Sequence, residues 1–152
     1  MKLRAPKPGW TAQADVVVIG SGVAGLTTAL QIRSHDLSVM LVTKSSVDEG
    51  STKWAQGGIA AALGPGDSPA QHERDTLVAG AGLCDLPAVK VLVSEGPEAV
   101  RKLIARGAVF DRSETGEIAL TREGGHLRNR ILHAGGDATG AEVSRALLAA
   151  VS

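Results

Sequence analysis

The stretch DVVVIGSGVAG, residues 15–25, joins a short β-branched apolar run to a glycine-rich turn. The run 15–19 is typical of a parallel strand that is buried on both faces. The glycines then follow the spacing G-x-G-x-x-G, in which the first makes a tight turn, the second admits a pyrophosphate and the third lets a helix pack on the strand. We therefore predict an anion-binding turn at a helix N-terminus, and the alternative is a glycine turn without a ligand. Its residues are Gly20, Ser21, Gly22, Val23, Ala24 and Gly25.

The residues after this turn continue a βαβ unit. Val23, Leu26 and Leu30 share one face of a predicted helix that ends near residues 34–36. Residues 37–43 then form a second buried strand. A crossover of this kind joins parallel strands and is right-handed.

The second strand ends Val42-Thr43-Lys44, without the acid that usually binds an adenosine ribose at this point. Two interpretations remain open. Thr43 and Lys44 contact the ribose through other hydrogen bonds, or Lys44 accepts the 2′-phosphate of NADP. Asp48 and Glu49 follow a few residues too late for the standard role.

Composition limits the classes of protein that fit. The 152 residues carry 16 Lys and Arg and 16 Asp and Glu, so the zero net charge argues against a nucleic-acid-binding protein. No apolar run approaches the roughly 18 residues that span a bilayer, and no secretory signal opens the sequence. The one cysteine, Cys84, excludes a disulfide framework and a cysteine zinc cage. We expect a cytoplasmic protein whose partners are neither nucleic acids nor membranes.

The spacing of apolar residues predicts further helices downstream. They cover residues 69–79, 85–94, 97–106 and 140–151. Asp85 suits the N-cap of the second, with Pro87 in its first turn, and Gly107 suits the C-cap of the third. Asp137 and Thr139 can cap the last helix.

Residues 108–110 and 118–121 are predicted to pair as a small hairpin around Thr115-Gly116. Only two buried strands are found, whereas a doubly wound sheet needs more. The predicted fold class is therefore α/β, an incomplete Rossmann-like nucleotide-binding domain with a βαβ start, a helical insertion and a small hairpin.

This domain is predicted to occupy residues 15–152, after an arm at residues 1–14, and to be the front part of a longer protein. Without later strands, Val16, Val18 and Val42 are expected to face water along an open edge, which favours aggregation.

Two polar segments are candidates for ligand contacts. Residues 50–58, GSTKWAQGG, are small enough for a flat ring to lie against the backbone, and Gln56 can bond to a heteroaromatic edge. The alternative is a surface loop. Residues 120–140 place arginines and histidines beside glycine pairs, which suits a carboxylate or phosphate ligand. The alternative for Arg128 and Arg130 is a solvated face. The histidines of this segment, His126 and His133, lack metal-ligand spacing, so no metal site is predicted.

Three blocks in this order resemble the L-aspartate oxidase family, which lies within the flavoprotein group of succinate dehydrogenases and fumarate reductases. They are GSGVAGL at 20–26, TKSSVDEGSTKWAQGGIAAAL at 43–63 and LTREGGHLRNRILHAGGDATG at 120–140. The resemblance runs from about Asp15 to the C-terminus. Leu127 and Asn129 depart from many relatives, which have Ser and a basic residue there.

The resemblance implies that FAD is held non-covalently, because Ser51 stands where succinate dehydrogenases carry the histidine that bonds to the flavin. Glu123 stands where those relatives have an apolar aromatic residue, and its carboxylate can receive the α-ammonium of an amino acid. Thr121 and His126 are further substrate-site candidates. Lys44 is expected at the adenosine end. The flavin side is expected to be lined by Ser51, Thr52, Lys53, Trp54, Ala55, Gln56, Gly57 and Gly58.

The resemblance also implies an oxidoreductase reaction in NAD biosynthesis. L-Aspartate loses a hydride from Cα to FAD and becomes iminoaspartate, O2 or fumarate re-oxidises the flavin, and quinolinate synthase consumes the product. The family's catalytic arginines and histidine are expected in a capping domain after residue 152, so this chain alone is expected to be inactive. The alternatives are another FAD- or NAD(P)-binding reductase of the fumarate reductase group, and a non-catalytic nucleotide-binding fragment.

Overall fold

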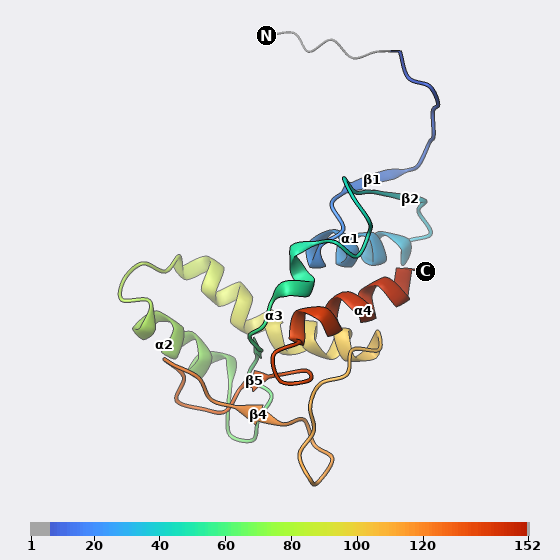
Figure 1. The fold of residues 1–152 in the computed structure, drawn as a ribbon. Coiled ribbons are helices and arrows are strands. Elements are labelled where there is room, and N and C mark those ends of the chain that lie inside the picture. The colour runs from blue at the N-terminus through green and yellow to red at the C-terminus, as the bar shows by residue number, and fades with distance from the viewer. Residues whose placement is uncertain (1–6, 152) are drawn as a thin grey trace.

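A computed structural model describes residues 7–151 of the chain, so the first six residues of the predicted arm lie outside the described part. The strand β1 (Val16–Ile19) pairs in parallel with β2 (Val39–Val42), and the helix α1 (Val23–Arg33) joins them (Figure 1). The predicted βαβ unit is therefore confirmed, with a second strand shorter than 37–43. The residues just before the two strands are also joined, because Ser38 donates its backbone N–H to Asp15 Oδ2 at 2.8 Å.

The helices α2 (Pro69–Ala79) and α3 (Leu86–Ala105) form a pair that extends from the rest of the molecule (Figure 1). The prediction of separate helices at 85–94 and 97–106 is wrong, since α3 continues through Pro97. Pro97 lacks the N–H that a helix interior uses, but it is buried on one face with Val93 and Val100. Packing of this face thus outweighs the lost hydrogen bond.

The predicted ends of α3 are confirmed. The Asp85 carboxylate accepts the backbone N–H of Ala88 at 2.8 Å, and Pro87 lies in the first turn. At the other end Gly107 has a φ of +92°, a left-handed conformation that glycine adopts without steric cost.

A small antiparallel sheet has the order β3-β5-β4. Its strands are β3 (Ile59–Ala60), β4 (Leu120–Thr121) and β5 (Ile131–Leu132). The predicted hairpin between 108–110 and 118–121 is wrong, because β4 pairs with β5 and residues 108–110 form no strand. Ala108 and Phe110 are buried in the core instead, and the N–H of Val109 donates to the Glu142 carboxylate at 2.6 Å. The two arms of this loop meet just after residue 110, where the Ala119 N–H donates to Asp111 O at 2.8 Å.

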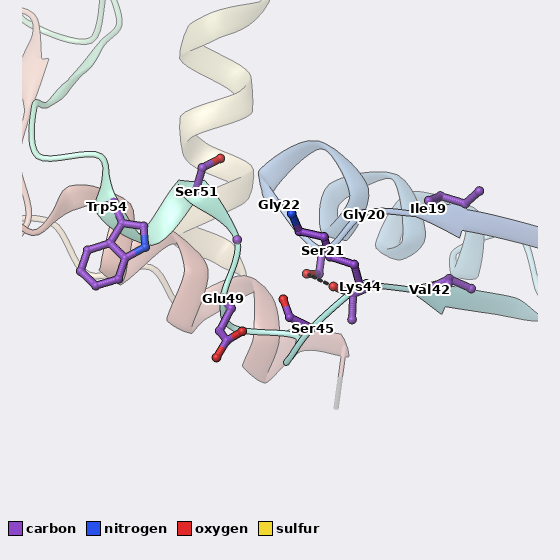
Figure 2. A pocket seen from close by; sticks show the side chains of 12 residues that line it. Ile19, Gly20, Ser21, Gly22, Val42, Lys44, Ser45, Glu49, Ser51 and Trp54 are labelled. Carbon is purple, nitrogen blue, oxygen red and sulfur yellow. Dashed lines mark hydrogen bonds between the residues drawn. The ribbon is translucent and has the colours of Figure 1, made fainter.

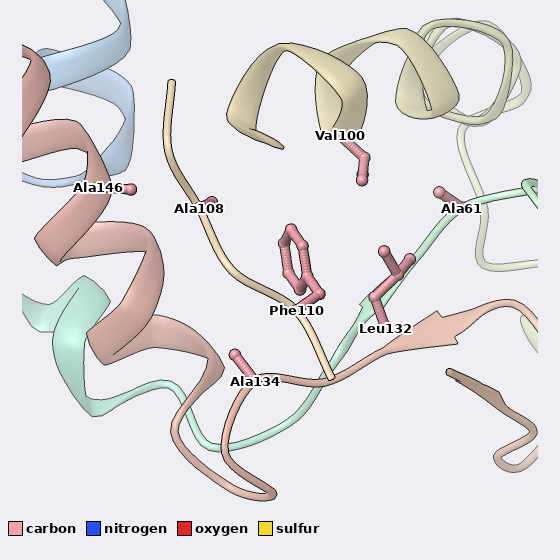
Figure 3. Packing of buried hydrophobic residues seen from close by; sticks show 7 residues of the cluster. All are labelled: Ala61, Val100, Ala108, Phe110, Leu132, Ala134 and Ala146. Atoms are coloured by element: carbon pink, nitrogen blue, oxygen red, sulfur yellow. The ribbon is translucent and has the colours of Figure 1, made fainter. Parts of the chain in front are cut away.

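The core lies where the small sheet, α3 and the final helix α4 (Thr139–Val151) meet, and Figure 3 shows its seven central side chains. They are Ala61, Val100, Ala108, Phe110, Leu132, Ala134 and Ala146. A second cluster, Leu26, Val143 and Leu147, joins α1 to α4. The helix α4 therefore connects the βαβ unit to the rest of the chain.

The strands β1 and β2 leave apolar side chains in contact with solvent. Ile19 is 84% exposed and Val17 is 54% exposed, and Val42 is 41% exposed as predicted. The expectation was wrong for Val18, which is buried because its side of the strand faces α1 at Gly25. Across residues 7–151, no helix is both long and apolar enough to span a bilayer.

Candidate functional site

A cavity of about 770 Å³ opens at the carboxyl ends of the parallel strands β1 and β2 (Figure 2). This is the edge at which open α/β sheets bind their ligands. The lining combines the glycine turn after β1, the residues after β2, and both ends of the short 3-10 helix η1 (Ser51–Trp54). It consists of Ile19, Gly20, Ser21, Gly22, Val42, Thr43, Lys44, Ser45, Glu49, Gly50, Ser51 and Trp54.

The glycine motif has the geometry that its spacing predicts. Gly20 has a φ of +109°, and a Cβ on Gly25 would lie 1.9 Å from the carbonyl oxygen of Gly20, so α1 can pack this closely only on glycine. Gly22 is the N-cap of α1 and brings no side chain to the helix N-terminus. The backbone of this N-cap lines the cavity, and the dipole of α1 favours an anion there.

The predicted segment 51–58 is divided between two surroundings. Ser51 and Trp54 line the cavity, and Thr52 Oγ1 accepts the N–H of Val23, the first residue of α1, at 2.9 Å. Lys53 Nζ lies 5.1 Å from the centre of the Trp54 ring.

Of the remaining residues of the segment, Ala55 and Gly58 contact the body of the protein. Ala55 O accepts the N–H of Gly140 at 2.9 Å. A Cβ on Gly58 would lie 2.3 Å from Ile131 Cγ2, so Gly58 lies directly against β5. Gln56 and Gly57 are exposed and outside the cavity lining.

The structure adds an acid that sequence reasoning had set aside. Glu49 lines the cavity with Lys44, although it follows β2 by seven residues rather than standing at its end. A carboxylate here can accept hydrogen bonds from ribose hydroxyls, and it disfavours a second phosphate beside Lys44. The end of β2 is tied to the glycine turn, since Ser21 Oγ donates to Thr43 Oγ1 at 3.2 Å.

The substrate-site candidates of segment 120–140 divide into two groups. Thr121 Oγ1 and Glu123 Oε1 lie 3.0 Å and 3.3 Å from Nε2 of His133. His126 faces the other way, with its Nδ1 3.2 Å from a guanidinium nitrogen of Arg130. The sequence predicts His133 only as one of several groups that suit a carboxylate or phosphate ligand, and its spacing of ten residues from Glu123 gives no sign of this contact.

Arg130 is fully buried, so the solvated-face alternative is wrong for this residue, whereas Arg128 is exposed. Its guanidinium makes a two-pronged ion pair with Asp67 at 2.9 and 2.8 Å and donates to Asp75 Oδ2 at 2.9 Å. Two carboxylates thereby compensate one buried cation. The signal that sequence reasoning missed is the pair of acids around the start of α2, far from Arg130 along the chain.

Two groups of this cluster have shifted pKa values. The N–H of Leu127, which donates to Asp75 Oδ2 at 2.9 Å, lowers the pKa of that carboxyl, and the charge of Arg130 adds to this effect. Burial lowers the pKa of His72, and the positive Arg130 lowers it further. Nδ1 of His72 is a buried atom without a hydrogen-bond partner within the described residues, and the ring lies 5.4 Å from that of His126.

A family known as the FAD binding domain matches residues 15–152, which is most of the chain. The chain belongs to this family. The match includes the glycine turn, both sides of the cavity and the whole of segment 120–140.

Relatives of this FAD binding domain include named enzymes. The chain is 68% identical over 151 residues to L-aspartate oxidase of Streptomyces coelicolor, which covers 99% of this chain and 26% of that protein. It is 53% identical over 141 residues to the chloroplastic L-aspartate oxidase of Oryza sativa, covering 93% of this chain and 22% of that protein. The chain therefore spans about a quarter of the length of these curated relatives.

Solved structures show the same fold. The Sdh1 complex of Mycobacterium smegmatis with UQ1 matches 91% of this chain and 23% of its own with a TM-score of 0.84 and 38% identity. Quinol fumarate reductase FrdA of E. coli matches 92% of this chain and 24% of its own with a TM-score of 0.82 and 29% identity. The βαβ start and the α2–α3 insertion are thus parts of a shared architecture.

The residues of this FAD binding domain fit the cofactor of the family. The close approach of Gly25 to Gly20 leaves no room for a side chain on Gly25, and the N-cap of α1, Gly22, lines the cavity with Lys44. These groups suit the negative pyrophosphate, and Glu49 suits a ribose.

Proposed function

We propose that the protein containing this chain is an L-aspartate oxidase, which oxidises L-aspartate to iminoaspartate and passes the electrons to O2 or fumarate. The observation that carries this proposal is the 68% identity, over nearly the whole chain, to an enzyme of that name. The chain would supply the FAD site and one side of the substrate site. The predicted capping domain would supply the rest.

The FAD site is assigned from the cavity and its neighbours. The glycine turn 20–25 and the N-terminus of α1 would hold the pyrophosphate, while Lys44 and Glu49 would contact the adenosine end. Segment 51–58 would line the flavin side without a covalent bond, because Ser51 offers no imidazole. FAD supplies the chemistry that accepts a hydride from the substrate Cα, and the residues of this chain orient the cofactor and exclude water.

The substrate contact in this chain would be Glu123. Its side chain is 56% exposed, and a carboxylate that is accessible in this way can accept hydrogen bonds from an ammonium group. Succinate and fumarate carry no ammonium group, so an acid at this position favours an amino acid over a plain dicarboxylate. Thr121 lies beside it through their shared contact with His133.

The partners and location belong to the same proposal. Iminoaspartate is an imine that water hydrolyses, so rapid consumption by quinolinate synthase, in NAD biosynthesis, would protect the product. We also propose a cytoplasmic location.

Thermal melting of the protein with FAD, with NADP and without ligand tests the cofactor assignment. A ligand at 100 times its Kd adds about 2.7 kcal/mol to the free energy of unfolding. We expect a shift with FAD only, since Glu49 opposes a second phosphate beside Lys44. A shift with NADP alone would replace the oxidase proposal with the reductase alternative.

The activity itself is tested by hydrogen peroxide formation from L-aspartate. The full-length protein, at the length of its curated relatives, is expected to form it, and the 152-residue chain alone is expected to form none. Peroxide formation by the short chain would contradict the assignment of catalytic groups to a capping domain.

A further inference from the structure

His133 lies where the flavin-side segment meets the substrate-side segment. Its Nε2 is 3.0 Å from Thr121 Oγ1 and 3.3 Å from Glu123 Oε1. On another side, an ideal Cβ on Gly58 would lie 3.0 Å from His133 Cε1, so the ring borders the last residue of segment 51–58. One imidazole therefore touches both segments that the proposed function uses.

The two partners of this contact differ in how firmly they are held. His133 follows Ile131 and Leu132, which are buried, and its carbonyl accepts the N–H of Asp111 at 2.8 Å. The His133 side chain is 18% exposed, whereas that of Glu123 is 56% exposed and projects from a turn. The imidazole is thus the more buried partner, and the carboxylate is the more exposed one.

The chemistry of the three groups selects one arrangement of protons. An ionised carboxylate only accepts hydrogen bonds, so Glu123 is attracted to Nε2 only when that nitrogen carries a proton. The Thr121 hydroxyl can accept as well as donate, so it tolerates the same tautomer. A ring with a proton on Nε2 therefore fits both neighbours.

We propose that His133 is a positioning residue that holds the Glu123 carboxylate in place for the ammonium group of an amino-acid substrate. Without this contact, Glu123 would have to lose side-chain freedom each time substrate binds, and that loss weakens binding. His133 thereby contributes to selection of an amino dicarboxylate over a dicarboxylate without nitrogen. This inference rests on the proposed function and on its assignment of Glu123.

The test uses the full-length protein with FAD bound and compares His133→Leu, His133→Gln and His35→Leu. Leucine removes the donor, while the glutamine amide can place an N–H near the position of Nε2. His35 is exposed just after α1 and serves as the matched control. For each variant, KM and kcat for L-aspartate are measured together with the inhibition constant of succinate, which lacks the ammonium group.

We expect His133→Leu to raise KM for L-aspartate about fivefold to tenfold, as the loss of one polar contact of ordinary strength does. The succinate inhibition constant and kcat are expected to stay within about twofold, and His133→Gln is expected to recover most of the loss. His35→Leu should leave every value unchanged. In a Glu123→Gln background, His133→Leu should add little further, because the two residues act as one unit.

The opposite results would overturn the inference. Equal weakening of L-aspartate and succinate, or a loss of kcat at constant KM, would show a general structural or catalytic role. If His133→Leu no longer binds FAD, His133→Gln becomes the deciding variant. A KM for L-aspartate that stays above the wild-type value in His133→Gln would then count against a positioning role. A wild-type protein that binds FAD but does not oxidise L-aspartate would refute the proposed function, and the inference with it. If the wild type is fully active and the His133 variants have the wild-type KM for L-aspartate, the inference is refuted but the proposed function is not.

Discussion

The cavity at β1 and β2 and the cluster around Arg130 treat polar groups in opposite ways. In the cavity, Lys44, Glu49 and the N-terminus of α1 face open space together. In the cluster, Arg130 and its two acids, Asp67 and Asp75, are buried and fully matched to one another. Polar groups that face a cavity can bind a ligand, whereas a buried, matched set can only support the structure around it.

The cluster also has a definite place in the fold. Asp67 precedes α2, Asp75 lies within it, and Arg130 precedes β5. The ion pairs therefore fasten the helical insertion to the segment that carries Glu123 and His133. Under the proposed function, the insertion would fix the substrate side and the open cavity would receive the cofactor.

The largest loss in the free energy of unfolding is expected when the buried cation, Arg130, is removed from the cluster. Arg130→Leu leaves two buried acids without a positive charge beside them, and breaking a buried pair in this way costs about 3–5 kcal/mol. Unfolding in urea measures the loss. The matched control is Arg101→Leu, because Arg101 is 60% exposed in its 3.6 Å pair with Glu98 and such a pair contributes about 0–1 kcal/mol. Similar losses for both variants would show that the cluster is not a special support.

A smaller effect is expected at the cavity from Gly25→Ala. The added Cβ meets the carbonyl oxygen of Gly20, so α1 must move away from the turn, and overpacking of this kind costs about 1–3 kcal/mol. FAD affinity, measured by fluorescence titration, should fall about tenfold or more. Gly96→Ala is the control, because open space surrounds Gly96 in α3 and alanine is the better helix former by about 1 kcal/mol. Wild-type FAD affinity in Gly25→Ala would contradict the close packing at the turn.

Acid should weaken the cluster in two steps. Because the pKa of His72 is lowered from 6.5, its contribution is complete above that value and declines as the pH falls toward the lowered pKa. The pKa of Asp75 is lowered from 3.8, so its contribution declines only below that value. Urea midpoints measured from pH 7.5 to 5 should fall less steeply for His72→Gln than for the wild type. The exposed His35→Gln should follow the wild-type curve, and an unchanged slope in His72→Gln would exclude His72 as the source.

The smallest effect is expected from Glu49→Gln. Loss of the charge on one ribose-binding acceptor should weaken FAD about threefold to tenfold, while NADP binding should improve because the negative charge beside Lys44 is gone. Asp48→Asn is the control, since Asp48 lies outside the cavity lining. Titrations with both nucleotides give the ratio, and an equal effect of the two variants would exclude a specific contact at Glu49.

The parts of the molecule that the sequence could predict are those governed by neighbouring residues. The βαβ unit, α2, α4 and both ends of α3 depend on local spacing, caps and glycines, and all are confirmed. The exception, Pro97, shows that local rules fail when tertiary packing is stronger. A proline predicts a helix break, but its burial with Val93 and Val100 keeps α3 continuous.

The parts that could not be predicted depend on distant pairs. Arg130 meets Asp75 and Asp67 across 55 and 63 residues, and no periodicity connects them. The same holds for Glu49, whose position on the cavity wall depends on the path of the loop after β2. In the candidate site, the sequence predicted the glycine turn and Lys44, which line the cavity. It predicted neither Glu49 in the lining nor the contact of His133 with Glu123.

The contact between Gly140 and η1 has a consequence for the order of folding. A Cβ on Gly140 would lie 2.0 Å from the carbonyl oxygen of Thr52, so the start of α4 presses against the loop whose threonine binds the first turn of α1. During synthesis this support arrives almost ninety residues after the loop itself, since Gly140 is made long after Thr52. The cofactor wall can therefore become rigid only when α4 has left the ribosome, and we expect a nascent chain that is shorter than this to release FAD readily.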